Sequence, residues 1–214
     1  MELKRTLKED GYQVFNITPL KDYLSTFNVD LEDYSKSFNS QDVFRTKLGD
    51  IKQIQNLHKY DTNRFNSLNG VLAGLIGAKK FTVLNNQYFC KPSNYKMTSP
   101  HQDNAYFESD EDVFTFWIPL QDVDFMNSCL YYVPKSHKRG LLEHKPIGTN
   151  VRTRTGTKGV SLYSDVYKNS EFDYVPMKFG EVVVHDKNTM HLSSPNMSDD
   201  LRVALTCIIK VDSF

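Results

Sequence analysis

Residues 180–205 read GEVVVHDKNTMHLSSPNMSDDLRVAL. A β-branched run comes first, a polar turn then leads to His191, and a second apolar run opens at Arg202. Short apolar runs separated by polar residues are typical of β-strands. In adjacent antiparallel strands, His191 and Arg202 would point into the same cavity. Ser193 would share the face of His191, because side chains two residues apart on a strand project the same way.

A second segment offers two more side chains that could bind a metal ion. Residues 101–107 read HQDNAYF, and an extended chain would place His101 and Asp103 on one face. With His191 they form a set of two histidines and one carboxylate, which is typical of non-haem iron(II) sites. Such a set leaves two coordination positions for a bidentate 2-oxo acid and one for O2. Arg202 would bind the far carboxylate of that acid through two parallel hydrogen bonds.

The first 80 residues carry mostly helical signals. Tyr12 to Phe15 could form a short strand, and Thr18 followed by Pro19 predicts the start of a helix. Gly77 favours the end of another helix. Three apolar stripes at helical spacing consist of Leu20, Tyr23, Leu24 and Phe27, of Phe44, Leu48 and Ile51, and of Phe65, Leu68, Leu72 and Ile76.

After residue 80 the pattern changes to short runs rich in β-branched and aromatic residues, which predict strands. These runs are Phe81 to Phe89, Val113 to Leu120, Leu130 to Val133, Val182 to Val184 and Arg202 to Val211. We therefore expect an α+β fold in which N-terminal helices pack on a double-stranded β-helix, or jelly roll. No linker or repeat divides the sequence, so we expect a single domain over residues 1–214. Residues 1–80 would be mostly helical support, and residues 81–214 would form the β-helix core.

The composition excludes several classes of function. Lys and Arg together number 26, as do Asp and Glu, so no global charge favours nucleic acid or a membrane surface. Three scattered cysteines form no CxxC pair, which is typical of a reducing compartment. We expect a cytoplasmic protein that acts on a small molecule, with no nucleic-acid or membrane partner, as a monomer or a homo-oligomer.

Several motifs resemble the phytanoyl-CoA dioxygenase family of iron(II)- and 2-oxoglutarate-dependent oxygenases. They are Asp10-Gly11-Tyr12, His101-Gln102-Asp103, Trp117-Ile118-Pro119-Leu120, the segment NSCLYYVPKSH at 127–137, Gly180-Glu181, and His191 with Ser193, Asn196 and Arg202. The resemblance implies a double-stranded β-helix, with iron(II) held by His101, Asp103 and His191. It also implies that Arg202 and Ser193 hold 2-oxoglutarate and that O2 is the co-reactant, with Lys91 and Trp117 lining the pocket. The implied reaction is hydroxylation of a small, polar or anionic metabolite, with release of succinate and CO2.

Some alternatives stay open from the sequence. His185 is a rival to His191 as metal ligand, although only His191 has the serine and the arginine at the family spacing. The basic residues of segment 135–158 are either a solvated loop or a lid that attracts an anionic substrate. A non-oxidative, metal-dependent cupin enzyme and a non-catalytic jelly-roll binding module are the rival functions.

Overall fold

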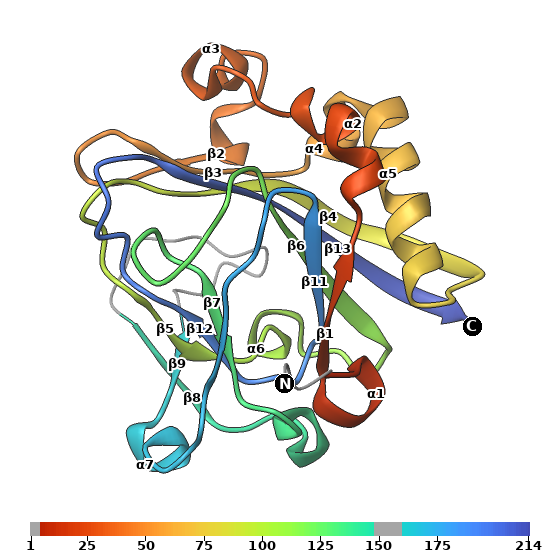
Figure 1. The fold of residues 1–214 in the computed structure, drawn as a ribbon, viewed down its shortest axis with the longest axis vertical. Coiled ribbons are helices and arrows are strands. Elements are labelled where there is room, and N and C mark those ends of the chain that lie inside the picture. Colours follow the sequence, from red (N-terminus) through yellow and green to blue (C-terminus); the bar gives the residue numbers. More distant parts are fainter. Residues whose placement is uncertain (1–4, 148–159) are drawn as a thin grey trace.

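Two antiparallel sheets form the body of the protein in the computed structural model, which describes residues 5–147 and 160–214 (Figure 1). The larger sheet has seven strands in the order β1-β11-β6-β13-β4-β3-β2, and the smaller has four in the order β10-β7-β12-β5. Strands β8 and β9 form a separate pair. The strands are β1 Tyr12–Asn16, β2 Val43–Arg45, β3 Ile51–Ile54, β4 Lys80–Lys91, β5 Thr98–His101, β6 Val113–Pro119, β7 Leu130–Tyr132, β8 His144–Pro146, β9 Val160–Leu162, β10 Asp173–Val175, β11 Glu181–Asp186, β12 His191–Ser193 and β13 Arg202–Ser213.

Helices are short, apart from α5, and most lie in the N-terminal part of the chain (Figure 1). They are α1 Leu7–Asp10, η1 Thr18–Leu20, α2 Lys21–Ser25, α3 Leu31–Ser35, η2 Ser40–Asp42, α4 Leu57–Tyr60, α5 Thr62–Leu75, α6 Asn104–Phe107, η3 Ser136–Arg139 and α7 Ser164–Tyr167. Among the described residues, no helix has the length and the apolar character needed to cross a bilayer.

Consecutive strands alternate between the two larger sheets from β4 to β7, and again from β10 to β13. This winding brings side chains of both sheets together. Trp117 of β6 and Val183 of β11 share one buried apolar cluster with Leu130 and Tyr132 of β7. The space between the sheets is therefore the interior of the β body.

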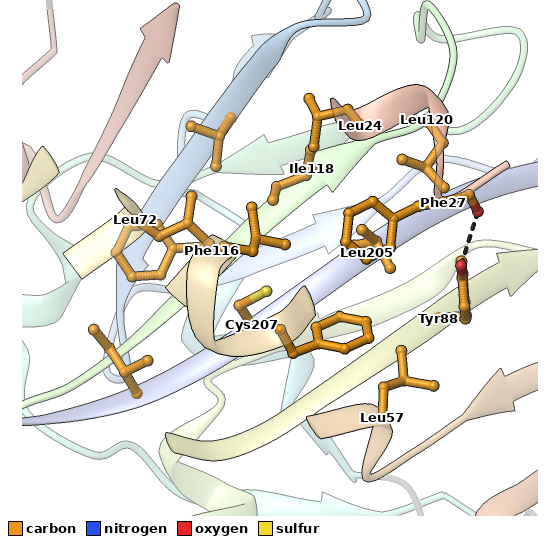
Figure 2. Close-up of a cluster of buried hydrophobic side chains, with 14 of the residues drawn as sticks. Leu24, Phe27, Leu57, Leu72, Tyr88, Phe116, Ile118, Leu120, Leu205 and Cys207 are labelled. Atoms are coloured by element: carbon orange, nitrogen blue, oxygen red, sulfur yellow. Dashed lines mark hydrogen bonds between the residues drawn. The ribbon is translucent and has the colours of Figure 1, made fainter. Parts of the chain in front are cut away.

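A second apolar core lies on the other face of the seven-stranded sheet, under the N-terminal helices (Figure 2). Successive residues of β6 alternate, so that Phe116 and Ile118 face this helix side while Trp117 faces the interior. Tyr88 of β4 also faces the helices, and its hydroxyl donates to the carbonyl of Phe27 at 2.8 Å (Figure 2). This alternation fixes which side chains of the large sheet can reach a site between the sheets.

The stripe that begins at Phe65 was predicted correctly as a helix. Phe65, Leu68 and Leu72 are fully buried on α5, and Gly77 follows its end with a φ of +76°. The long strand-like runs also coincide with β4, β6, β7, β11 and β13.

The stripe over Phe44, Leu48 and Ile51 is not a helix, and this prediction was wrong. Phe44 lies in β2 and Ile51 in β3, which pair as a hairpin. Thr46 N–H donates to the carbonyl of Asp50 at 2.8 Å across the turn, and Leu48 at its tip is 92% exposed. Three apolar residues at a spacing of three to four were too few to separate a helix from two short strands.

The first predicted helix start is displaced by one residue. Thr18 is the first residue of the 3-10 helix η1 and not its cap, and α2 follows at Lys21. Pro19 lies within the first turn, where its missing N–H costs no hydrogen bond.

Candidate active site

His101, Asp103 and His191 come together at one end of the small sheet. His101 ends β5 and His191 begins β12, and these two residues are direct partners across the strand pair. The Nε2 atoms of both histidines are 3.6 Å from Asp103 Oδ1. Ligand atoms about 2.1 Å from an ion and at right angles lie about 3 Å apart, so the group could hold a metal ion with little adjustment.

Asp103 reaches this group from a turn. Its backbone is helical, with φ −62° and ψ −29°, and it precedes α6, so the expectation of an extended 101–103 segment was wrong. The two side chains converge because the chain bends after His101 toward the space between the sheets.

Hydrogen bonds fix both imidazoles in the tautomer that a metal ion requires. His101 Nδ1 lies 2.8 Å from the carbonyl of Ser99, and His191 Nδ1 lies 2.9 Å from that of Thr189. A carbonyl oxygen only accepts, so each Nδ1 carries the proton and each Nε2 presents its lone pair to the shared space.

The outer oxygen of Asp103 is held by two neighbours from the large sheet. Thr115 donates its hydroxyl to Oδ2 at 2.6 Å, and His185 Nε2 lies 3.1 Å from the same atom. The hydroxyl of Tyr132 lies 2.9 Å from His185 Nδ1. We infer that Tyr132 donates to Nδ1 and that the Nε2–H of His185 donates to Asp103. Oδ1 is thereby left for an ion.

His185, the rival ligand from the sequence, is not part of the group that could hold a metal ion. It lies on β11 directly opposite Thr115 of β6, so both reach Asp103 from adjacent strands. Thr115 was not among the residues that the sequence identified, and Tyr132 appeared only within the 127–137 motif, without a role of its own. The alternation of β6 could have indicated Thr115, because it shares a face with Trp117.

The charges in this cluster favour a divalent cation. Burial alone would raise the pKa of Asp103, but the surrounding histidines, among them His185 through its hydrogen bond to Oδ2, hold that pKa well below its usual value. Burial and the neighbouring His101 keep the pKa of His191 well below its usual range. An ionised carboxylate beside a neutral imidazole is the protonation state that metal binding needs.

Arg202 and Lys91 lie side by side at the end of the large sheet. They are partners in the pairing of β13 with β4, and both side chains are fully buried. Arg202 donates to the carbonyl of Phe89 at 3.1 Å, while its Nε is buried with no hydrogen-bond partner in the part of the chain that the structure describes. Its guanidinium lies 5.3 Å from the ring centre of Trp117. Among the described residues, neither Arg202 nor Lys91 forms an ion pair with a carboxylate.

Ser193 connects these cations to the metal-binding group. Lys91 Nζ donates to Ser193 Oγ and to the carbonyl of Ser194, both at 2.7 Å. Ser193 follows His191 by two residues on β12, a separation of about 7 Å along a strand. Lys91 thus links Ser193 to Arg202, but β12 and β13 are not the adjacent strands that the sequence suggested, because they belong to different sheets.

Burial lowers the pKa values of both cations. It lowers the pKa of Lys91 to about 6, with the charge of Arg202 as a second cause, and it lowers the pKa of Arg202 to about 10. A buried guanidinium without a counter-charge is costly. An anionic ligand at Arg202 would remove that cost.

The structure describes only part of the basic segment. Lys138 Nζ pairs with Glu9 at 2.8 Å, and the Lys145 ammonium lies 5.6 Å from the ring centre of Tyr163. These two cations are therefore engaged by neighbouring side chains. Arg152, Arg154 and Lys158, which the predicted lid also includes, lie outside the described residues.

Replacing His185 by alanine or Thr115 by valine should weaken binding of divalent metal by about 10- to 100-fold, because each change removes a hydrogen bond that orients Asp103. Thr115→Ser, which keeps the hydroxyl, should bind metal as the unmodified protein does. Titration with zinc(II) against a competing chelator measures the affinity. Equal affinities for Thr115→Val and Thr115→Ser would contradict this role.

Gly11 contacts residues next to the metal-binding group. Gly11→Ala should lower the free energy of unfolding by about 1–3 kcal/mol. Its φ is +87°, and an added Cβ would lie 2.5 Å from His137 Nδ1 and from Thr189 Oγ1. Its carbonyl accepts at 2.7 Å from the hydroxyl of Thr189, the residue whose own carbonyl fixes His191. Denaturant unfolding measures the loss. Gly49→Ala is the matched control, because Gly49 has a φ of +100° with no atom within 4 Å of the added Cβ. An equal loss in both variants would mean that the close contacts at Gly11 do not matter.

Comparison with known proteins places the chain in a family. The family model for phytanoyl-CoA dioxygenase matches residues 20–204. The phytanoyl-CoA dioxygenase of Arabidopsis thaliana is 31% identical over 137 residues, which are 62% of this chain and 46% of that protein. The chain thus spans about half the length of the plant and animal relatives that it matches.

Solved structures share the fold across nearly the whole chain. EvdO2 of Micromonospora carbonacea, solved in complex with 2-oxoglutarate, superposes with a TM-score of 0.74 at 20% identity and covers 100% of this chain and 95% of its own. EctD of S. alaskensis, solved with 2-oxoglutarate and 5-hydroxyectoine, gives a TM-score of 0.73 at 17% identity. The match covers 96% of this chain and 73% of EctD. At these identities the structural likeness concerns the fold alone. The family model, by contrast, covers most of the sequence, and the chain therefore belongs to the phytanoyl-CoA dioxygenase family.

Proposed function

We propose that this protein is an iron(II)- and 2-oxoglutarate-dependent dioxygenase that hydroxylates a small molecule and releases succinate and CO2. The observation that carries the proposal is the occurrence of two features in the space between the sheets. His101, Asp103 and His191 form a group that could hold a metal ion, and Arg202 is buried with no ion pair and no partner for its Nε among the described residues. An ion and a dicarboxylate together would satisfy both.

The donor set fits iron(II). Two neutral imidazole nitrogens and one carboxylate oxygen approach a common point from one side, as in the facial arrangement used by non-haem iron oxygenases. His101, Asp103 and His191 would hold the ion. When bound, iron(II) with 2-oxoglutarate and O2 supplies the oxidising chemistry that the side chains lack.

The far carboxylate of 2-oxoglutarate would be held by Arg202 and Ser193. Arg202 has an unused Nε donor, so it can offer the carboxylate a two-bond contact. Ser193 accepts from Lys91 through its oxygen, so its own proton can be donated to the same carboxylate. Trp117 covers the guanidinium and limits access of water to this pair.

We also propose that residues 1–214 form one domain whose β body is a double-stranded β-helix. The alternation of β4 to β7 and β10 to β13 between two facing sheets supports this topology. The part before residue 81 contributes support as helices on one face and as strands β1, β2 and β3 at the edges of the large sheet.

Release of succinate from 2-oxoglutarate tests the proposal. We expect slow succinate formation by the purified protein alone, dependent on both iron(II) and O2, and faster formation when a substrate is added. A non-oxidative cupin enzyme or a binding module would form no succinate under any of these conditions. Absence of succinate from protein that binds iron(II) would reject the proposed reaction.

A further inference from the structure

Beyond the metal-binding group, the interior face of the large sheet carries a set of amide side chains that the proposed reaction has not used. Facing residues can be followed across the sheet, because directly paired residues of adjacent strands share a face. Starting from His185, the paired residues in order are Thr115, Ile208 and Asn85. Starting from Val183, they are Trp117, Thr206 and Gln87. Starting from Pro119, they are Ala204, Phe89 and Gln53.

The amides of these rows therefore face the same interior as Asp103. Asn86 and Tyr88, which alternate with them on β4, face the helix side instead, where Asn86 bonds Asn69 at 2.8 and 2.9 Å. Asn85 is two strands away from Thr115, which corresponds to about 10 Å. This separation is comparable to the length of a small molecule.

Apolar packing does not extend to this part of the interior. The cluster between the sheets includes Trp117, Val183 and Ala204, but no residue of β3 or β4. Ile208, although buried, belongs to neither apolar cluster. The interior is therefore apolar near β11 and β6, whereas toward β4 and β3 it carries the amides of Asn85, Gln87 and Gln53 beside Phe89.

The amides keep free hydrogen-bond donors. Asn85 donates to the oxygen of Gln87 at 3.3 Å, and Gln55 donates to the oxygen of Gln53 at 3.4 Å. The amide nitrogens of Gln87 and Gln53 have no hydrogen-bond partner among the described residues. Thr206, paired with Gln87, is 5% exposed, and its hydroxyl is buried with no partner. An unpaired buried hydroxyl costs free energy, so a bound molecule would restore its hydrogen bond.

These groups carry no charge. In the three rows, the only residue that can be charged is His185, and its two ring nitrogens are already hydrogen-bonded to Asp103 and Tyr132. Arg202 and Lys91 form the next row, where the proposed function assigns Arg202 to the cosubstrate carboxylate and Lys91 donates to Ser193. An anion buried against Gln53, Gln87 and Thr206 would find no counter-charge within these rows, whereas neutral oxygens would meet suitable donors.

We propose that Gln87, Gln53 and Thr206 bind the substrate through uncharged hydroxyl or carbonyl oxygens, so that the substrate is a neutral, hydroxyl-rich small molecule and not an anion or an acyl thioester. This inference rests on the proposed function for the position of the reacting centre. Under this inference, specificity comes from hydrogen bonds to side chains of the large sheet and not from attraction of an anion by the basic segment 135–158.

Binding of defined probes tests the inference without turnover. Protein loaded with zinc(II) and 2-oxoglutarate is mixed separately with glycerol, myo-inositol, glucose, butyrate and octanoate, and binding is followed by saturation-transfer NMR. We expect at least one of the three polyols to bind and neither carboxylate to bind. Gln87→Leu, which keeps the side-chain size, should weaken the polyol at least tenfold. Gln41→Leu is the matched control, because Gln41 is exposed.

The affinity for 2-oxoglutarate separates the two proposals. In Gln87→Leu, the affinity for 2-oxoglutarate should stay within twofold of that of the unmodified protein. The affinity of the unmodified protein for 2-oxoglutarate tests the proposed function alone. A large loss of 2-oxoglutarate affinity in Gln87→Leu would assign Gln87 to the cosubstrate and overturn the inference. Binding of carboxylates alone, of no probe at all, or of polyols equally by Gln87→Leu would overturn it as well.

Discussion

Asp103→Ala is expected to abolish 2-oxoglutarate turnover and to reduce affinity for iron(II) by far more than the roughly 100-fold upper effect of losing a supporting hydrogen bond. Asp103 supplies the only carboxylate of the metal-binding group, and its Oδ1 lies 3.6 Å from Nε2 of both His101 and His191. Without it, two neutral imidazoles remain, and they neither balance the charge of the ion nor define a face of its coordination sphere.

Variants of the neighbouring histidines sharpen this expectation. His101→Ala and His191→Ala should be as inactive as Asp103→Ala, whereas His185→Ala should keep measurable turnover at high iron(II). Iron(II) titration and succinate release measure the two effects on the same preparations. An inactive His185→Ala beside an active His191→Ala would show that the assignment of the ligands is wrong.

Arg202→Ala is expected to raise the apparent KM for 2-oxoglutarate by roughly 30- to 150-fold, which corresponds to the loss of about 2–3 kcal/mol from a charge-assisted pair. Arg202→Lys should recover only part of this, because an ammonium cannot form the two parallel bonds. Steady-state kinetics with 2-oxoglutarate as the varied component measures the change. An unchanged KM in Arg202→Ala would remove the basis for this contact.

Stability distinguishes a binding role of Arg202 from a structural one. The guanidinium is fully buried without a carboxylate partner among the described residues, so Arg202→Met should leave the free energy of unfolding without cosubstrate unchanged or higher. The same variant should lose the stabilisation that 2-oxoglutarate gives to the unmodified protein. A large destabilisation of the unliganded protein would instead make Arg202 part of the structural core.

Much of the scaffold could be predicted because its strands and its longest helix are long enough to show a period. The 14 residues of α5 and the 12 of β4 and of β13 each carry several turns or alternations. The hairpin of β2 and β3 was misread because each strand has only three or four residues. Strands β5 and β12, which carry His101 and His191, are equally short and polar, so they gave no strand signal of their own.

The candidate site was predictable where residue chemistry is distinctive and local. A histidine two residues before an aspartate, and a histidine with a serine and an arginine at fixed spacing, identified most of it. The hydrogen bonds that orient Asp103 were not predictable, because His185 lies 82 residues along the chain and meets Asp103 only through the register of β11 with β6. Gln87 was overlooked for the same reason, since its exposure to the interior depends on the pairing of β4 with β13.

Visible absorption of the anaerobic protein tests the central claim most directly. Iron(II) is added first and 2-oxoglutarate second, in the absence of O2. Chelation of an iron(II) held by His101, Asp103 and His191 should produce a weak charge-transfer band that appears only after the second addition, saturates at one 2-oxoglutarate per protein and is absent from Asp103→Ala. No band in the unmodified protein, or an equal band in Asp103→Ala, would contradict an iron- and 2-oxoglutarate-binding site at these residues.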